Sequence, residues 1–89
     1  MMKTDKEIRE SIRGCYDKID ESIDNEKRFE SVNTPEIILN YQKTRAYIYG
    51  WKDLLMNQNI HPTDIVAGPP EVYESYKMGR TNAKKWKSN

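Results

Sequence analysis

The chain has 89 residues, of which 36% are hydrophobic and 33% are charged, and its formal net charge is +1. A chain of this length forms a single domain with a thin core, because small domains bury a smaller share of their surface on folding. A net charge this close to zero excludes the overall electrostatic field of a strongly basic nucleic-acid-binding domain or of an acidic DNA mimic.

The first predicted element is a helix over about 5–29. Thr4 and Glu7 have the spacing of a capping box, in which each side chain accepts a hydrogen bond from the backbone amide of the other residue. Apolar residues then recur at spacings of four, three, four and four and form one narrow stripe: Ile8, Ile12, Cys15, Ile19 and Ile23. The opposite face of this helix is charged. We therefore expect it to cover one face of one neighbour.

The second predicted helix, over about 35–57, has the clearest start in the sequence. Thr34 supplies an N-cap, and Pro35 stands at the first helical position, where its missing N–H is harmless. The short connection to the preceding helix predicts an antiparallel hairpin. A seam with matching spacing is expected to face the first helix: Ile37, Tyr41, Thr44, Ile48, Trp51 and Leu55.

This second helix carries more apolar surface than one neighbour can cover. The residues beyond the seam are predicted to form an interface with a second protomer or with a target protein: Leu39, Ala46, Tyr47, Gly50 and Leu54. Ala46 and Gly50 form a small-x-x-x-small pair, a pattern that lets two helix backbones approach closely. A glycine that only weakens the helix is the alternative interpretation of Gly50.

The third predicted helix, over about 70–86, begins after the break at Gly68-Pro69-Pro70. Its apolar stripe consists of Val72, Tyr76, Gly79, Ala83 and Trp86, and the preceding Ile65 and Val66 are expected to pack onto the hairpin. The sequence therefore predicts one all-α domain over 1–89. Its architecture is a long antiparallel helical hairpin plus a shorter C-terminal helix, completed by oligomerisation.

The sequence offers little for catalysis or metal binding. His61 is the only histidine and Cys15 the only cysteine, so the chain cannot supply the four ligands of a zinc site. The two residues have no motif spacing that would pair a nucleophile with a base. The glycines are isolated, which excludes a glycine-rich phosphate loop. We therefore expect no catalytic residue, no metal and no cofactor, and predict that the chain is not an enzyme.

Basic residues gather at the C-terminal end, where 77–89 carry five bases and no acid. The candidate contacts for an anion or a nucleic acid are Lys43, Arg45, Lys77, Arg80, Lys84, Lys85 and Trp86. The sequence pI of about 7.8 is below that of most specific nucleic-acid-binding domains. Lysines that favour the helix dipole and solubility are therefore the alternative interpretation.

Three classes of function remain. The first is a non-enzymatic helical homo-oligomer of the phage or mobile-element type, an inhibitor that occludes a host protein or sequesters an anionic nucleotide. The second is a nucleic-acid-binding regulator that uses the basic C-terminal helix, and the third is a structural or assembly subunit. No segment is long and apolar enough to span a membrane, and the first residues lack the apolar region of a signal peptide. We therefore expect no membrane partner and a cytoplasmic protein, in the bacterial host if a phage encodes it.

Overall fold

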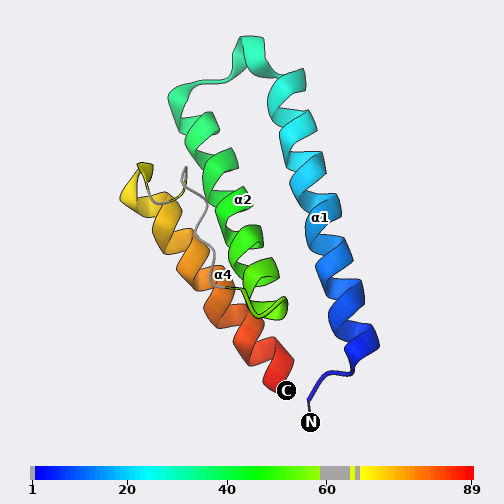
Figure 1. Ribbon diagram of the computed structural model, residues 1–89. Helices are drawn as coiled ribbons and strands as arrows, with labels where there is room; N and C mark the ends of the chain where they lie inside the picture. The colour runs from blue at the N-terminus through cyan, green and yellow to red at the C-terminus, as the bar shows by residue number, and fades with distance from the viewer. Residues whose placement is uncertain (1, 59–64, 66) are drawn as a thin grey trace.

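Figure 1 shows the computed structural model, which describes residues 2–58, 65 and 67–89. The all-α fold is confirmed, because the described residues form helices and no strand. The main elements are α1 (Asp5–Arg28), α2 (Pro35–Leu55) and α4 (Pro70–Ser88), with a short 3₁₀ helix η1 (Glu30–Val32) between α1 and α2. The helix starts fall at the predicted residues, whereas α1 and α2 end slightly earlier and α4 slightly later than predicted.

Both starts of the hairpin helices are capped as predicted. The Thr4 hydroxyl accepts from the Glu7 amide at 3.2 Å, and the Thr4 amide donates to the Glu7 carboxylate at 3.2 Å. These hydrogen bonds to Thr4 hold the pKa of Glu7 below its ordinary value. At the start of α2, the Thr34 hydroxyl accepts from the Ile37 amide at 3.3 Å. Side chains close in sequence therefore define both helix starts.

The end of α2 is a Schellman motif centred on Asn57. The Gln58 amide donates to the Asp53 carbonyl at 2.8 Å, and the Asn57 amide donates to the Leu54 carbonyl at 3.1 Å. Asn57 has a φ of 56°, in the left-handed region that asparagine tolerates better than most residues with a Cβ. The motif satisfies carbonyls that the last turn of the helix would otherwise leave without a donor.

We expect Asn57→Gly to be neutral or slightly stabilising and Asn57→Val to cost about 1–2 kcal/mol, because a β-branched side chain clashes in the left-handed region. Urea denaturation of both variants beside the wild type would measure the difference. Equal stability of the two variants would contradict the strain assigned to this position.

The helix α2 lies between the other two long helices (Figure 1). α1 runs antiparallel to α2, which confirms the hairpin, and α4 runs parallel to α2 on its other side. The chain ends therefore meet at one end of the molecule, where the Lys3 amide donates to the Lys87 carbonyl at 3.2 Å. In this arrangement α2 has a neighbour on two sides, and its remaining sides lie between α1 and α4.

The α2–α4 contact is close because small residues meet at the crossing. Gly50 of α2 lies against the backbone of α4, and a Cβ there would stand 2.0 Å from the Tyr76 carbonyl oxygen. The relation is reciprocal, since a Cβ on Gly79 would stand 2.0 Å from the Tyr47 carbonyl oxygen. Ala46 and Ala83 are also buried, so each helix presents a small-x-x-x-small pair to the other.

This crossing corrects part of the predicted interface. The sequence predicts that Ala46 and Gly50 contact a second protomer or a target, but the chain's own α4 buries both. The physical reason is that Ala46 and Gly50 can pack against any helix that carries two small residues at the same spacing. Gly79 and Ala83 of α4 are such residues within the same chain. Both positions are therefore closed to a partner.

The core forms around this crossing. Its buried residues include Ala46, Ile65, Val72 and Tyr76, with Leu39, Tyr49 and Tyr73 packed against them. The predicted packing of Ile65 onto the hairpin is confirmed by its 5% exposure, whereas Val66 lies outside the described residues. The predicted stripe of the third helix is the buried face of α4, which buries Val72, Tyr76, Gly79 and Ala83.

The seam between α1 and α2 is less complete than predicted. Cys15 and Ile19 of α1 are buried, as is Leu55 of α2. Thr44, however, is exposed, and Ile37 keeps 39% of its surface exposed. The narrow stripe of α1 covers only part of the apolar flank of α2, so this flank remains partly open.

Candidate functional site

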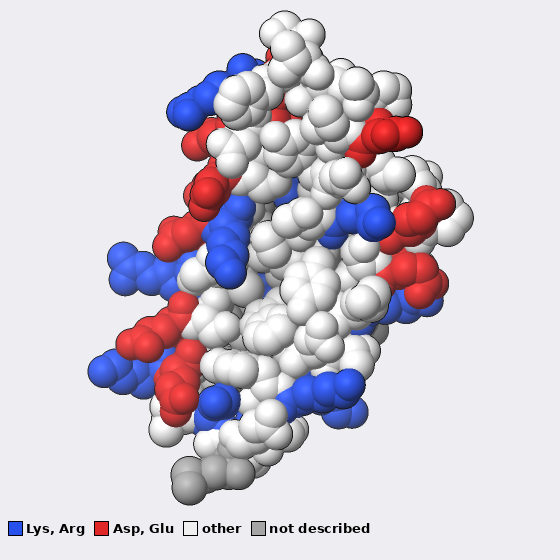
Figure 2. Space-filling model, turned by 180° about the vertical axis from the view of Figure 1, so that it is seen from behind, with Lys and Arg blue, Asp and Glu red and all other residues white. Residues whose placement is uncertain are grey.

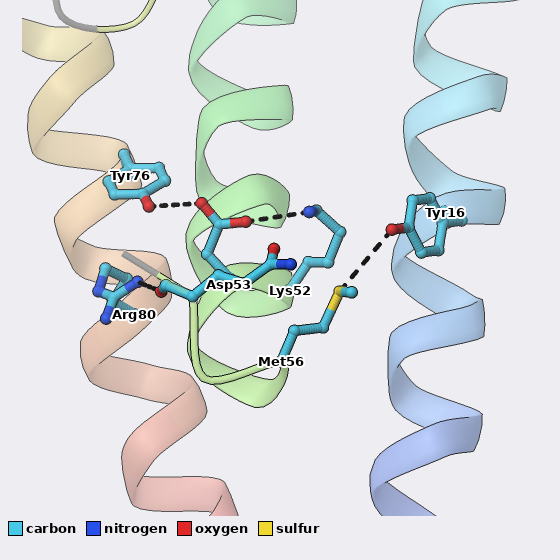
Figure 3. Close-up of polar contacts among 7 residues, drawn as sticks. Tyr16, Lys52, Asp53, Met56, Tyr76 and Arg80 are labelled. Atoms are coloured by element: carbon cyan, nitrogen blue, oxygen red, sulfur yellow. Dashed lines mark hydrogen bonds and ion pairs between the residues drawn. The ribbon is translucent and has the colours of Figure 1, made fainter. Parts of the chain in front are cut away.

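A buried polar network joins α2 to α4 (Figure 3). Asp53 of α2 is 2% exposed, and its carboxylate accepts from the Tyr76 hydroxyl at 2.6 Å. The second carboxylate oxygen lies 3.0 Å from the Lys52 ammonium. Nearby, the Arg80 guanidinium donates to the Gln58 carbonyl at 2.8 Å. The network thus connects the last turn of α2 and its Schellman motif to the middle of α4.

Burial, reinforced by the hydrogen bond to Asp53, raises the pKa of Tyr76 from its ordinary value near 10 to about 12. Tyr76 is therefore a neutral hydrogen-bond donor at neutral pH. Its side chain is fully buried, so no substrate can reach the hydroxyl without opening the fold. These properties suit a residue that holds α2 and α4 together, and they argue against a role as nucleophile or base.

One opening on the hairpin is a groove between α1 and α2 with a volume of about 290 Å³. We call it the hairpin groove, and its lining residues are Ser11, Gly14, Cys15, Lys18, Tyr47, Ile48 and Trp51. The indole N–H of Trp51 donates to the Ser11 hydroxyl at 3.1 Å, and its ring lies 6.0 Å from that of Trp86. Trp51 of α2 therefore contacts both α1 and α4.

Figure 2 shows the molecule from behind the view of Figure 1. A broad uncharged area runs down the middle of this side, between Lys, Arg, Asp and Glu side chains that stand at its edges (Figure 2). Among the described residues that line the groove, Lys18 alone is charged. Burial raises the pKa of the Cys15 thiol, so the thiolate needed for nucleophilic chemistry is disfavoured there.

The rest of the predicted interface lies at or near open surface. Tyr47 lines the groove, and its hydroxyl accepts a hydrogen bond from the side-chain amide of Asn82 at 2.8 Å. Leu54 is partly buried, and Leu39 packs against the core. Sequence reasoning missed Ser11, Gly14 and Lys18 because polar or small residues on a charged helix resemble a solvated face.

The predicted anion-binding residues do not gather on one surface. Arg45 of α2 forms an ion pair with Glu26 of α1 at 2.9 Å, and Lys43 is partly buried on α2. Of the basic residues of α4, Lys77 pairs with Glu74 at 2.8 Å, while Arg80 donates to the Gln58 carbonyl, as described above. Intramolecular partners thus engage both arginines and Lys77.

The remaining members of that set lie towards the end of α4. Lys84 and Lys85 are exposed. Trp86 is partly buried, with the Lys3 ammonium 5.1 Å from its ring centroid. An exposed pair of lysines is a small basic surface compared with the several phosphate contacts that typical nucleic-acid binders make.

Within the described residues, no group of three or more His, Cys, Asp or Glu side chains could hold a metal ion. None of the helices described is long and apolar enough to cross a membrane. His61 lies outside the described residues. Comparison with known proteins found no matching family model, no similar curated protein and no similar solved structure.

Proposed function

We propose that this chain is a non-enzymatic binding protein that works as a homo-oligomer, with the hairpin groove as part of the contact between protomers. The observation that carries the proposal is the position of α2. It is apolar most of the way round, yet α1 and α4 cover only two of its sides. A helix with this pattern is normally buried on several sides.

Exposed apolar side chains extend the candidate contact beyond the groove. Ile37 belongs to the same flank of α2 as Ile48 and Trp51, and Phe29, the C-cap residue of α1, also keeps 48% of its surface exposed. Aromatic residues such as Trp51 and Tyr47 are enriched among residues that dominate binding energy. Removing this surface from water would favour a complex by about 25 cal/mol for each Å² of apolar area buried, before the entropic cost of association is subtracted.

A second copy of the chain is the occupant that the charge pattern favours. The net charge of +1 produces little repulsion between copies, and a net charge near zero promotes association. The edges of the uncharged area carry both signs (Figure 2), so one copy can oppose the charges of another. The dispersed basic residues favour occlusion of a target protein over nucleotide capture or nucleic-acid binding as the action of the oligomer.

The test replaces one exposed threonine inside the proposed contact and one outside it. Thr44 lies on the open flank of α2, whereas Thr81 lies on the outer side of α4, and both are exposed. Thr44→Arg should convert the oligomer to a monomer, because an unpaired charge in an apolar contact is costly. Thr81→Arg should leave the molar mass of the oligomer unchanged. Light scattering after size-exclusion chromatography measures both, and a monomeric wild type at micromolar concentrations would refute the proposal.

A further inference from the structure

A second pocket lies on the opposite side of α2 from the hairpin groove. Its volume is about 390 Å³, within the range of small-molecule sites. Residues of α1, of α2, of the segment before α4 and of the first turn of α4 line it: Ile23, Gln42, Arg45, Ala46, Tyr49, Ile65, Gly68, Pro69 and Val72. Most of these side chains are apolar, and the polar groups of Gln42 and Arg45 come from neighbouring turns of α2. A ligand here would have an apolar body and one polar end.

The positive charge of Arg45 at the polar end of the pocket is already balanced by Glu26. The Arg45 guanidinium lies 2.9 Å from the Glu26 carboxylate, with 18% of the arginine side chain exposed. Glu26 therefore fixes the guanidinium and neutralises it. A ligand carboxylate placed against Arg45 would meet the negative charge of Glu26, and like charges at short range in a partly buried site disfavour binding.

An uncharged carboxamide meets no such repulsion. Gln42 lines the pocket, and its amide can both donate and accept a hydrogen bond. Arg45 keeps N–H groups beyond the one that contacts Glu26, because a guanidinium carries five. A carboxamide supplies the matching acceptor and donors. Its apolar chain would contact Ile23, Ile65 and Val72.

We propose that this pocket binds an uncharged amphipathic carboxamide and discriminates against the carboxylate of the same shape through the Arg45–Glu26 pair. The proposal does not depend on the oligomer, because the pocket and the hairpin groove lie on opposite sides of α2. Octanamide and octanoate are the probes, since they share one chain and differ in the charge of the polar end.

The experiment follows backbone amide shifts of the ¹⁵N-labelled full chain during titration with each probe. Octanamide should shift the amides of the pocket residues and bind at least about tenfold more tightly than octanoate. In Glu26→Gln, which releases the charge of Arg45, octanoate should become the tighter ligand. Gln42→Leu should weaken octanamide binding, whereas Asn40→Leu, at an exposed position of α2 outside the pocket, should not.

Three results would overturn the proposal. The first is the absence of shifts at the pocket residues with octanamide, and the second is tighter binding of octanoate by the wild type. The third is an unchanged preference in Glu26→Gln, which would show that the ion pair does not select the ligand. The spectra also report whether each variant is folded, so loss of the fold is distinguished from loss of binding.

Discussion

Gly50→Ala is expected to destabilise the fold by about 3 kcal/mol, as severe overpacking does, although alanine favours helices over glycine by about 1 kcal/mol. The added Cβ would stand 2.0 Å from the Tyr76 carbonyl oxygen and 3.0 Å from the Arg80 nitrogen. Both atoms belong to the backbone of α4, so no side-chain rotation relieves the clash. The two helices must separate, and the buried contacts of Ala46 and Ala83 weaken with them.

Gly14→Ala is the matched control for this substitution. Gly14 lies inside α1, and a Cβ there would meet nothing within 4 Å. This variant should therefore gain about 0.5–1 kcal/mol from helix propensity and from the lower entropy of the unfolded chain. Urea denaturation at one fixed protein concentration compares the two, because self-association would otherwise shift the apparent stability. Equal stability of both variants would show that α2 and α4 are not in backbone contact.

Gly79 on α4 provides a second test of the backbone contact between α2 and α4. A Cβ on Gly79 would meet the Tyr47 carbonyl oxygen as closely as one on Gly50 meets that of Tyr76. Gly79→Ala should therefore cost about as much as Gly50→Ala. The double variant should cost less than the sum, because separating the helices once relieves both clashes.

The sequence predicted the elements and their starts because these depend on residues close together in the chain. The hydroxyls of Thr4 and Thr34 accept hydrogen bonds from backbone amides three residues further along the chain, and these capping signals can be read without the fold. The burial of Tyr76 and Ala83 also followed from the periodicity of the third helix. Local hydrogen bonds and amphipathic spacing are sufficient for both kinds of prediction.

The partner of each helix face could not be predicted in the same way. The pair of Ala46 and Gly50 indicates that some backbone approaches, but the pattern is the same for a second protomer and for α4. A second small pair, Gly79 and Ala83, was visible in the third helix, and matching the two pairs would have favoured the intramolecular contact. The buried Asp53 gave no signal, because its partner Tyr76 is 23 residues away and a charge in the last turns of α2 resembles a solvated one.

The stabilisation contributed by Tyr76 is expected to disappear as the pH rises from about 10 to about 12. Its pKa is near 10 in the unfolded chain and about 12 in the folded protein, so the folded state holds the phenol proton more tightly. The contribution is therefore complete below pH 10 and is lost as the pH approaches 12. The difference of two pKa units corresponds to about 2–3 kcal/mol.

Tyr76→Phe isolates this contribution from the other groups that titrate at high pH. The variant leaves the buried Asp53 carboxylate without its hydroxyl donor, which should cost about 2–3 kcal/mol at neutral pH. Between pH 10 and 12 the gap between wild type and variant should close, because only the wild type loses the phenol proton. Tyr16→Phe, at a tyrosine with 46% of its surface exposed, is the control and should cost under about 0.5 kcal/mol. Urea denaturation across this pH range measures all three proteins, and a gap that stays constant up to pH 12 would contradict a proton held by burial and Asp53.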